Sequence, residues 1–187
     1  MPTRQEVYAA IDGEREYQVR CWQQSCAKAG ISYRPDDTKS VDEWLIFIRG
    51  YYADAIREAS HQPGGGEELH VVRKLAALCV ACMETHGSFY RREDGTSGPF
   101  VPGPLVRGQV HTLINTERTY QDNLPDTRTD GSNHTVCGFL CMFDTYLRRA
   151  IDGWTNNPGT AEALDNIRKL AGICVHCMEK HGAPHRE

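Results

Sequence analysis

One 19-residue stretch occurs twice in this chain. Residues 69–87 read LHVVRKLAALCVACMETHG and residues 164–182 read LDNIRKLAGICVHCMEKHG, so the copies lie 95 positions apart and agree at 12 of 19 positions. At 100° per residue the apolar positions fall on one side of a helix, and a glycine follows where the helix should end. The repeat therefore predicts a core helix that is present in two copies.

The charged positions of this repeated helix fall on the side opposite the apolar stripe. They are Arg73, Lys74 and Glu84 in the first copy and Arg168, Lys169 and Glu179 in the second. We expect them on an outer, solvated face, although paired guanidinium and ammonium groups would also suit phosphate groups. Arg148 and Arg149 add positive charge in the second copy alone.

Two further helices are predicted in each copy. Thr3–Glu6 and Ser40–Glu43 have the spacing of capping boxes, and each opens a segment with an apolar stripe. In the second copy the matching helices are expected near residues 105–124 and 135–154. Residues 23–39 show no sustained period and read as a loop.

Three helices with one apolar stripe each bury too little surface to stand alone. We therefore predict an all-α fold of two tandem three-helix units, packed as a pseudo-twofold helical bundle. Residues 1–87 form the first repeat, residues 88–104 the linker and residues 105–187 the second repeat. The first helices align at an offset of 103 and the others at 95, so the second repeat is eight residues shorter between its first two helices.

Composition limits the function classes. The chain has 187 residues, 40% of them hydrophobic and 25% charged, with a net charge of -4, which gives no electrostatic reason to expect duplex nucleic acid as a partner. No apolar run reaches the ~20 residues of a membrane span, and the start MPTRQEVYAA is not a signal peptide. The eight cysteines are then best read as reduced, and we expect a cytoplasmic protein.

The most informative polar signal lies on the first helix of each repeat. The string EREYQ at residues 14–18 recurs as ERTYQ at residues 117–121, and its Glu and Gln lie on the apolar stripe. A buried polar group is costly unless it is paired, so the string is either a structural network or the lining of a polar pocket between the copies. The candidate ligand-binding residues are Glu14, Arg15, Tyr17, Gln18, Glu117, Arg118, Tyr120, Gln121, Arg73 and Arg168.

The cysteines of the repeated helix offer a second chemistry. Cys79, Cys82 and His86 have a C-x2-C-x3-H spacing, which Cys174, Cys177 and His181 repeat. Structural zinc requires four ligands, and C-x2-C pairs usually lie on turns, whereas a reduced buried cysteine behaves as a small hydrophobic residue. We therefore predict no metal site and no cofactor.

The strings E-R-x-Y-Q and R-K-x-A-x-x-x-x-x-C-M-E-x-H-G, with a short aromatic helix between them, resemble those of small helical proteins of phages and prophages. The size and order of the helices are also similar to the MazG-like nucleoside triphosphate pyrophosphohydrolases. That resemblance implies an E-x-x-E and an E-x-x-D motif that hold magnesium on a triphosphate. This chain departs from it, because the second helix of each repeat has no carboxylate on its inward stripe.

Three functions follow from these patterns. The favoured one is a non-catalytic helical module that binds a nucleotide or nucleotide-like small ligand, which in a phage would act as an anti-defence sponge for a host signalling nucleotide. The alternatives are a divergent MazG-like pyrophosphohydrolase, with carboxylates from Asp12, Glu14 and Glu16 or from Glu117, and a purely structural or protein-binding module. Binding is favoured over catalysis because the second repeat has Asn115 and Thr119 in place of Asp12 and Glu16. Homo-oligomers of the pseudo-dimer are compatible with the pattern.

Overall fold

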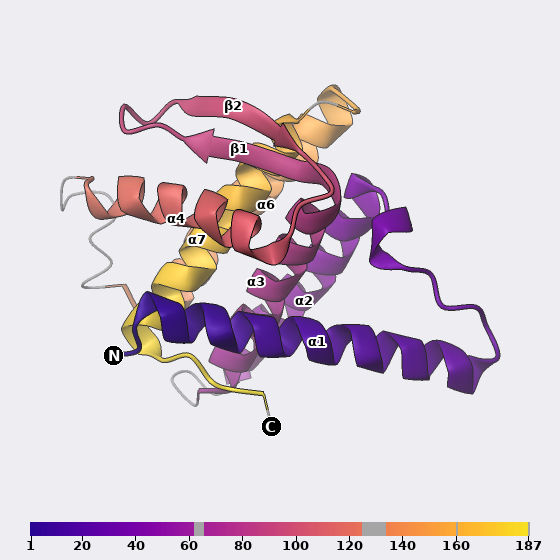
Figure 1. The fold of residues 1–187 in the computed structure, drawn as a ribbon. Helices are drawn as coiled ribbons and strands as arrows, with labels where there is room; N and C mark the ends of the chain where they lie inside the picture. The colour runs from indigo at the N-terminus through magenta and orange to yellow at the C-terminus, as the bar shows by residue number, and fades with distance from the viewer. Residues whose placement is uncertain (62–65, 125–133, 160, 187) are drawn as a thin grey trace.

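The computed structural model describes residues 1–61, 66–124, 134–159 and 161–186, and it is mostly helical (Figure 1). The helices of the described residues are α1 (Arg4–Ala29), α2 (Val41–His61), α3 (Glu67–His86), α4 (Arg107–Asp122), α6 (Val136–Asn156) and α7 (Glu162–His181), with a 3-10 turn, η1 (Asp36–Thr38). Two strands, β1 (Gly87–Arg91) and β2 (Ser97–Pro102), form one small antiparallel sheet. The predicted all-α class is thus confirmed at the level of a mostly helical chain.

The two repeated helices, α3 and α7, pack against each other at the centre of the molecule. α1 and α2 lie against α3, and α4 and α6 lie against α7 (Figure 1). Every residue of α3 from Ala76 to Met83 has no exposed surface. A stretch that is buried on all sides belongs in a core. The predicted solvated face is wrong for Arg73, which is also fully buried, whereas Lys74 and Glu84 are partly exposed.

The helix starts follow the capping signals. Thr3 accepts a hydrogen bond from the Glu6 backbone N–H (3.3 Å), and the Thr3 backbone N–H donates to Glu6 Oε2 (2.6 Å), so this capping box is formed. The Ser40 backbone N–H donates to Glu43 Oε2 (2.7 Å) before α2. Helices α4 and α6 begin and end within a few residues of the predicted 105–124 and 135–154.

Two predicted connections differ from the structure. Residues 23–29 are the last turns of α1 rather than loop, because they contain no Gly or Pro, and Gly30 ends the helix at a φ of 67°. Residues 88–104, predicted as a linker, contain most of the β1–β2 hairpin, in which Phe89 pairs with Phe100. The second repeat was predicted to be eight residues shorter between its first two helices. Most of that connection, residues 125–133, lies outside the described residues.

The hairpin lies against α4 and α7, the first and third helices of the second repeat (Figure 1). It begins directly at Gly87, the residue that ends α3. The sequence that follows the first core helix therefore crosses onto the other repeat. This crossing places Arg91 and Gly95 beside α4.

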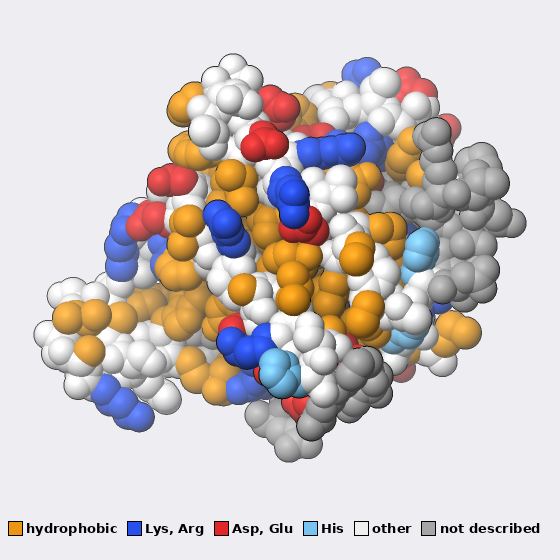
Figure 2. Space-filling view, turned by 180° about the vertical axis from the view of Figure 1, so that it is seen from behind, with side chains coloured by type: hydrophobic (Ala, Val, Ile, Leu, Met, Phe, Trp, Pro, Cys, Tyr) orange, Lys and Arg blue, Asp and Glu red, His pale blue; other side chains and the backbone are white. Residues whose placement is uncertain are grey.

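The opposite face of the molecule carries apolar side chains interspersed with charged ones (Figure 2). The exposed large hydrophobic residues of α2 include Ile46, Phe47 and Ile56. Within the described part of the chain, no helix is both long and apolar enough to cross a membrane.

Gly87 is expected to tolerate no side chain. Its φ is 83°, and a Cβ there would lie 2.1 Å from the backbone oxygen of Val101 in the paired strand. Gly87→Ala should lower the free energy of unfolding by at least about 2 kcal/mol, because the strained backbone and the clash act together. Chemical denaturation measures this loss.

The matched control is Gly50→Ala in the middle of α2, where a Cβ would meet nothing within 4 Å. It should stabilise the protein by about 0.5–1 kcal/mol, the usual gain of alanine over glycine inside a helix. Equal effects of the two substitutions would contradict the hairpin geometry.

Candidate functional site

Each repeat contains a buried glutamate–arginine ion pair between its first and third helices. Arg73 Nη2 lies 2.9 Å from Glu14 Oε2, and Arg168 Nη2 lies 3.2 Å from Glu117 Oε2. Both arginines are completely buried and both glutamates are at most 2% exposed. The placement of Arg73 and Arg168 on a solvated face is therefore wrong, because the E-R-x-Y-Q strings of α1 and α4 cover that side of the core helices.

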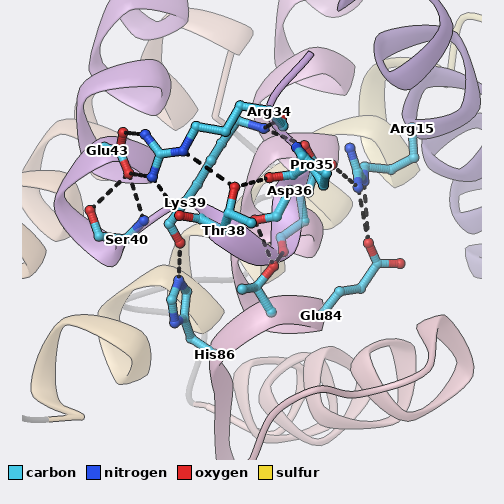
Figure 3. A network of polar contacts seen from close by, with 12 residues as sticks. Arg15, Arg34, Pro35, Asp36, Thr38, Lys39, Ser40, Glu43, Glu84 and His86 are labelled. Carbon is cyan, nitrogen blue, oxygen red and sulfur yellow. Dashed lines mark hydrogen bonds and ion pairs between the residues drawn. The ribbon is translucent and has the colours of Figure 1, made fainter. Parts of the chain in front are cut away.

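The arginines of the strings pair with other carboxylates. Arg15 Nη2 lies 3.1 Å from Glu84 Oε2 and 2.8 Å from Asp36 Oδ2, as Figure 3 shows. Arg118 Nη2 lies 3.0 Å from Glu179 Oε2. Glu14, the neighbour of Arg15 in the string, is bonded to Arg73 instead.

Figure 3 also shows how the segment before α2 is tied to the core. Lys39 Nζ donates to Asp36 Oδ1 (2.6 Å) and lies 4.9 Å from the ring centre of Trp22. His86 Nε2 lies 2.8 Å from the backbone oxygen of Lys39. His86 therefore anchors the backbone of this segment and does not join the cysteines of its own helix.

The four cysteines of the repeated helices are core residues. Cys79, Cys82, Cys174 and Cys177 are all buried. Burial raises the pKa of the Cys79 thiol and raises that of Cys177 to about 12, so both stay protonated at neutral pH. In the described part of the chain, no three His, Cys, Asp or Glu side chains form a group that could hold a metal ion.

A pocket of about 500 Å³ lies among α4, α6, α7 and the hairpin, and we call it the α4–α6–α7 pocket. A volume of this size is typical of small-molecule sites. Its lining residues are Arg91, Gly95, Glu117, Tyr120, Gln121, Leu124, Phe139, Met142, Thr145, Tyr146, Arg149, Lys169, Ile173 and His176.

The hairpin and α4 form one wall of this pocket. Arg91 Nε and Nη2 donate to the two oxygens of Glu117 at 2.7 and 3.2 Å, a bidentate contact. The guanidinium of Arg91 lies 4.6 Å from the ring centre of Tyr120. Gly95 approaches the same ring so closely that a Cβ would lie 2.5 Å from the tyrosine oxygen, so the Tyr120 ring is held in place. Burial acts to lower the pKa of Arg91, but the bond to Glu117 outweighs it and the pKa is raised.

Positive side chains of α6 and α7 form the opposite wall. The Arg149 guanidinium lies 5.2 Å and Lys169 Nζ lies 6.0 Å from the ring centre of Tyr146. Lys169 also pairs with Asp165 (2.6 Å), which pairs in turn with Arg168 (2.8 Å). Burial lowers the pKa of Arg168, although the carboxylates of Glu117 and Asp165 act to raise it. Burial acts to raise the pKa of Asp165, but the positive charges of Lys169 and Arg168 outweigh it and the pKa is lowered.

The charges around the pocket do not balance. The cations are Arg91, Arg149, Arg168 and Lys169, and the carboxylates that face them are Glu117 and Asp165. Two positive charges are therefore in excess beside two tyrosine rings. This arrangement suits an anionic ligand with a flat ring.

A second, smaller pocket of about 410 Å³ lies on the other side of His176 and is lined in part by Arg4, Arg118 and Asp122. Burial lowers the pKa of His176 to about 4, and the nearby charge of Arg118 adds to this effect. His176 is therefore neutral at pH 7, and its ring lies edge-on to Phe139 with centres 5.1 Å apart.

Of the ten residues predicted to bind a ligand, only residues of the second repeat line a pocket described above. Glu117, Tyr120 and Gln121 line the α4–α6–α7 pocket, and Arg118 and Gln121 line the smaller one. Arg168 lies behind Glu117. The residues of the first repeat, Glu14, Arg15, Tyr17, Gln18 and Arg73, line neither pocket.

The sequence analysis missed two lining residues of the pocket: Arg91, which lies in the predicted linker, and Tyr146, which was not among the candidates. A signal for Arg91 was present, because Arg91 and Arg186 each follow the terminal glycine of the core helix by four residues. Arg186 lies 3.4 Å from the ring centre of Tyr17, as Arg91 lies against Tyr120. Lys169 was predicted on an outer face and Arg149 was noted only as extra charge.

Comparison with known proteins gives no relative for this chain: no family model, no curated protein and no solved structure matches it.

Breaking the buried pair of the first repeat should destabilise the fold strongly. Arg73→Ala leaves Glu14 as a buried charge without its close partner and should cost about 3–5 kcal/mol of unfolding free energy. Replacing both residues by leucine or methionine should restore most of the loss, because no buried charge remains. Urea denaturation of the single and double variants measures both effects.

The exposed Asp54–Arg57 pair (2.7 Å) provides the control. Arg57→Ala should change the unfolding free energy by less than about 1 kcal/mol. A loss on Arg73→Ala no larger than this would contradict the burial of the pair.

His176 should make stability depend on pH. Its folded pKa of about 4 is below the value of ~6.5 in unfolded chains, so only the unfolded state gains this proton as the pH falls from 6.5 toward 4. Stability is lost over this range at up to about 1.4 kcal/mol per pH unit. His176→Ala, which introduces the residue found at the matching position Ala81, should flatten the curve of melting temperature between pH 6.5 and 4. An unchanged slope would rule out a neutral buried His176.

Proposed function

We propose that the chain is a non-catalytic binding module of two tandem three-helix units related by a pseudo-twofold axis, and that its α4–α6–α7 pocket takes a nucleotide or nucleotide-like small ligand.

Contacts that recur at matching positions support the paired units. Arg4 Nε lies 2.6 Å from Glu179, and the residues that match them, Arg107 and Glu84, lie 2.8 Å apart. Each of these pairs joins the first helix of one repeat to the core helix of the other. Tyr8 and its counterpart His111 stack on each other with ring centres 4.3 Å apart, as expected of equivalent residues at a twofold axis.

The ligand class rests on the excess of two positive charges beside Tyr120 and Tyr146. A phosphate monoester carries a charge of about -1.5 to -2 at pH 7, which matches this excess. Arg149 forms no ion pair with any described residue, so its guanidinium is available for charge-assisted hydrogen bonds. Stacking of a base on an aromatic side chain adds about 1–3 kcal/mol.

The pairing of the motif glutamates favours binding over hydrolysis. A pyrophosphohydrolase needs carboxylates that are free to hold magnesium on the triphosphate. Glu14 and Glu117 are instead bonded to buried arginines. A protein that binds a nucleotide without converting it lowers the free concentration of that nucleotide, which is the action of a sponge.

Arg149→Ala tests the pocket. Isothermal titration with AMP, GMP, CMP and UMP, and with the four nucleosides, should show binding of at least one nucleotide and weaker binding of its nucleoside. Arg149→Ala should weaken nucleotide binding about 10- to 150-fold, the equivalent of 1.5–3 kcal/mol for a hydrogen bond to a charged group.

Arg148→Ala is the matched control, because Arg148 is the preceding residue of α6 but faces the groove toward α2 and pairs with Asp144. It should leave the affinity unchanged. Equal losses in both variants, or no binding of any of the four nucleotides, would refute the proposed site. Release of pyrophosphate from a nucleoside triphosphate with magnesium would favour the hydrolase.

A further inference from the structure

We infer that the first repeat contains a closed counterpart of the α4–α6–α7 pocket, kept shut by Trp22 and Asp54, so that one chain binds one nucleotide. This inference rests on the proposed function.

The polar half of the pocket is present in the first repeat. The Glu14–Arg73 pair corresponds to Glu117–Arg168, and Arg186 on the ring of Tyr17 corresponds to Arg91 on Tyr120. The carbonyl of Pro184 accepts a hydrogen bond from Arg73, as the carbonyl of Phe89 accepts one from Arg168. A ligand would thus find similar groups at this end of either site.

The apolar wall differs, because in the first repeat it is covered. Phe139 and Met142 line the open pocket, and the residues 95 positions earlier are Trp44 and Phe47. The Trp22 ring lies against both, with ring centres 6.2 and 5.8 Å apart. Trp22 therefore covers, in the first repeat, the wall that in the second repeat lines an open pocket among the described residues.

The covering tryptophan is itself held in place. It lies in the last turns of α1, whereas α4 ends at Asp122, whose counterpart is Val19. Lys39 Nζ lies 4.9 Å from the Trp22 ring and 5.3 Å from the Trp44 ring. The length of α1 thus decides that this wall is covered.

The charge at the mouth also differs between the repeats. Arg149 of the open pocket corresponds to Asp54, whose carboxylate pairs with Arg57 at 2.7 Å. This exchange replaces the cation at the matching position by a carboxylate, so the first repeat lacks the guanidinium that the open pocket offers to a phosphate. Like charges at close range oppose binding, so Asp54 acts as the electrostatic part of the closure.

Removing both obstacles should create a second site. The test counts bound nucleotide by native mass spectrometry and titration, with the member of the AMP, GMP, CMP and UMP panel that binds best, or AMP if none binds. The wild-type chain should hold one nucleotide and the Trp22→Ala/Asp54→Arg variant two. Adding Arg149→Asp to that variant should return the count to one, now in the first repeat.

Trp154→Ala/Asp54→Arg is the matched control, since it also loses a tryptophan and the same carboxylate but keeps Trp22 in place. It should hold one nucleotide. Thermal melting shows whether each variant is folded, and Trp22→Leu, a smaller change, replaces Trp22→Ala if that variant unfolds.

The outcomes separate this inference from the proposed function. Two nucleotides on the wild-type chain, or one on the wild-type chain and still only one on the folded Trp22→Ala/Asp54→Arg variant, overturn the inference and leave the open pocket standing. No nucleotide on the wild type but one on that variant supports the inference and refutes the open pocket. No nucleotide on either protein overturns both.

Discussion

Two buried glutamate–arginine pairs set how the helices of this molecule pack on one another. Charges that leave water must be paired closely, because removal of one partner leaves an uncompensated charge in the core. Glu14 with Arg73 and Glu117 with Arg168 meet this condition, each joining a first helix to a core helix. The pairs fix the position of α1 along α3 and of α4 along α7, since sliding either helix by one turn would separate the charges.

The same pairs bind the two halves of the chain to each other. Each buried arginine also donates to a backbone carbonyl in the segment that follows the core helix of the other half: Arg73 to Pro184 and Arg168 to Phe89. Neither half therefore completes its own polar core. This exchange explains why a segment rich in Gly and Pro is structured here, because Phe89 and Arg91 of the hairpin are parts of the second repeat's site.

From this shared framework the two halves have become unequal. In the second half, the Glu117–Arg168 pair lies next to the α4–α6–α7 pocket. Arg149 and Lys169 lie near the Tyr146 ring in this pocket, and its cations outnumber its carboxylates. In the first, Trp22 covers the matching wall and Asp54 reverses the matching charge. The same buried ion pair therefore lies beside an open pocket in the second half and beside a covered aromatic cluster in the first.

The sequence by itself determined that a core helix is duplicated, that capped helices precede it, and that Glu14 and Glu117 occupy positions where packing alone would place an apolar residue. Local signals suffice for these features, because helical periodicity and capping depend on residues a few positions apart. The partners of the glutamates were not predicted. Periodicity placed Arg73 and Arg168 opposite the apolar stripe, and only the packing of α1 and α4 onto that side showed them to be buried. The pocket could not be predicted from the sequence for the same reason. It is lined by residues of four elements, Arg91, Tyr120, Tyr146 and Lys169, and only the tertiary structure brings these elements together.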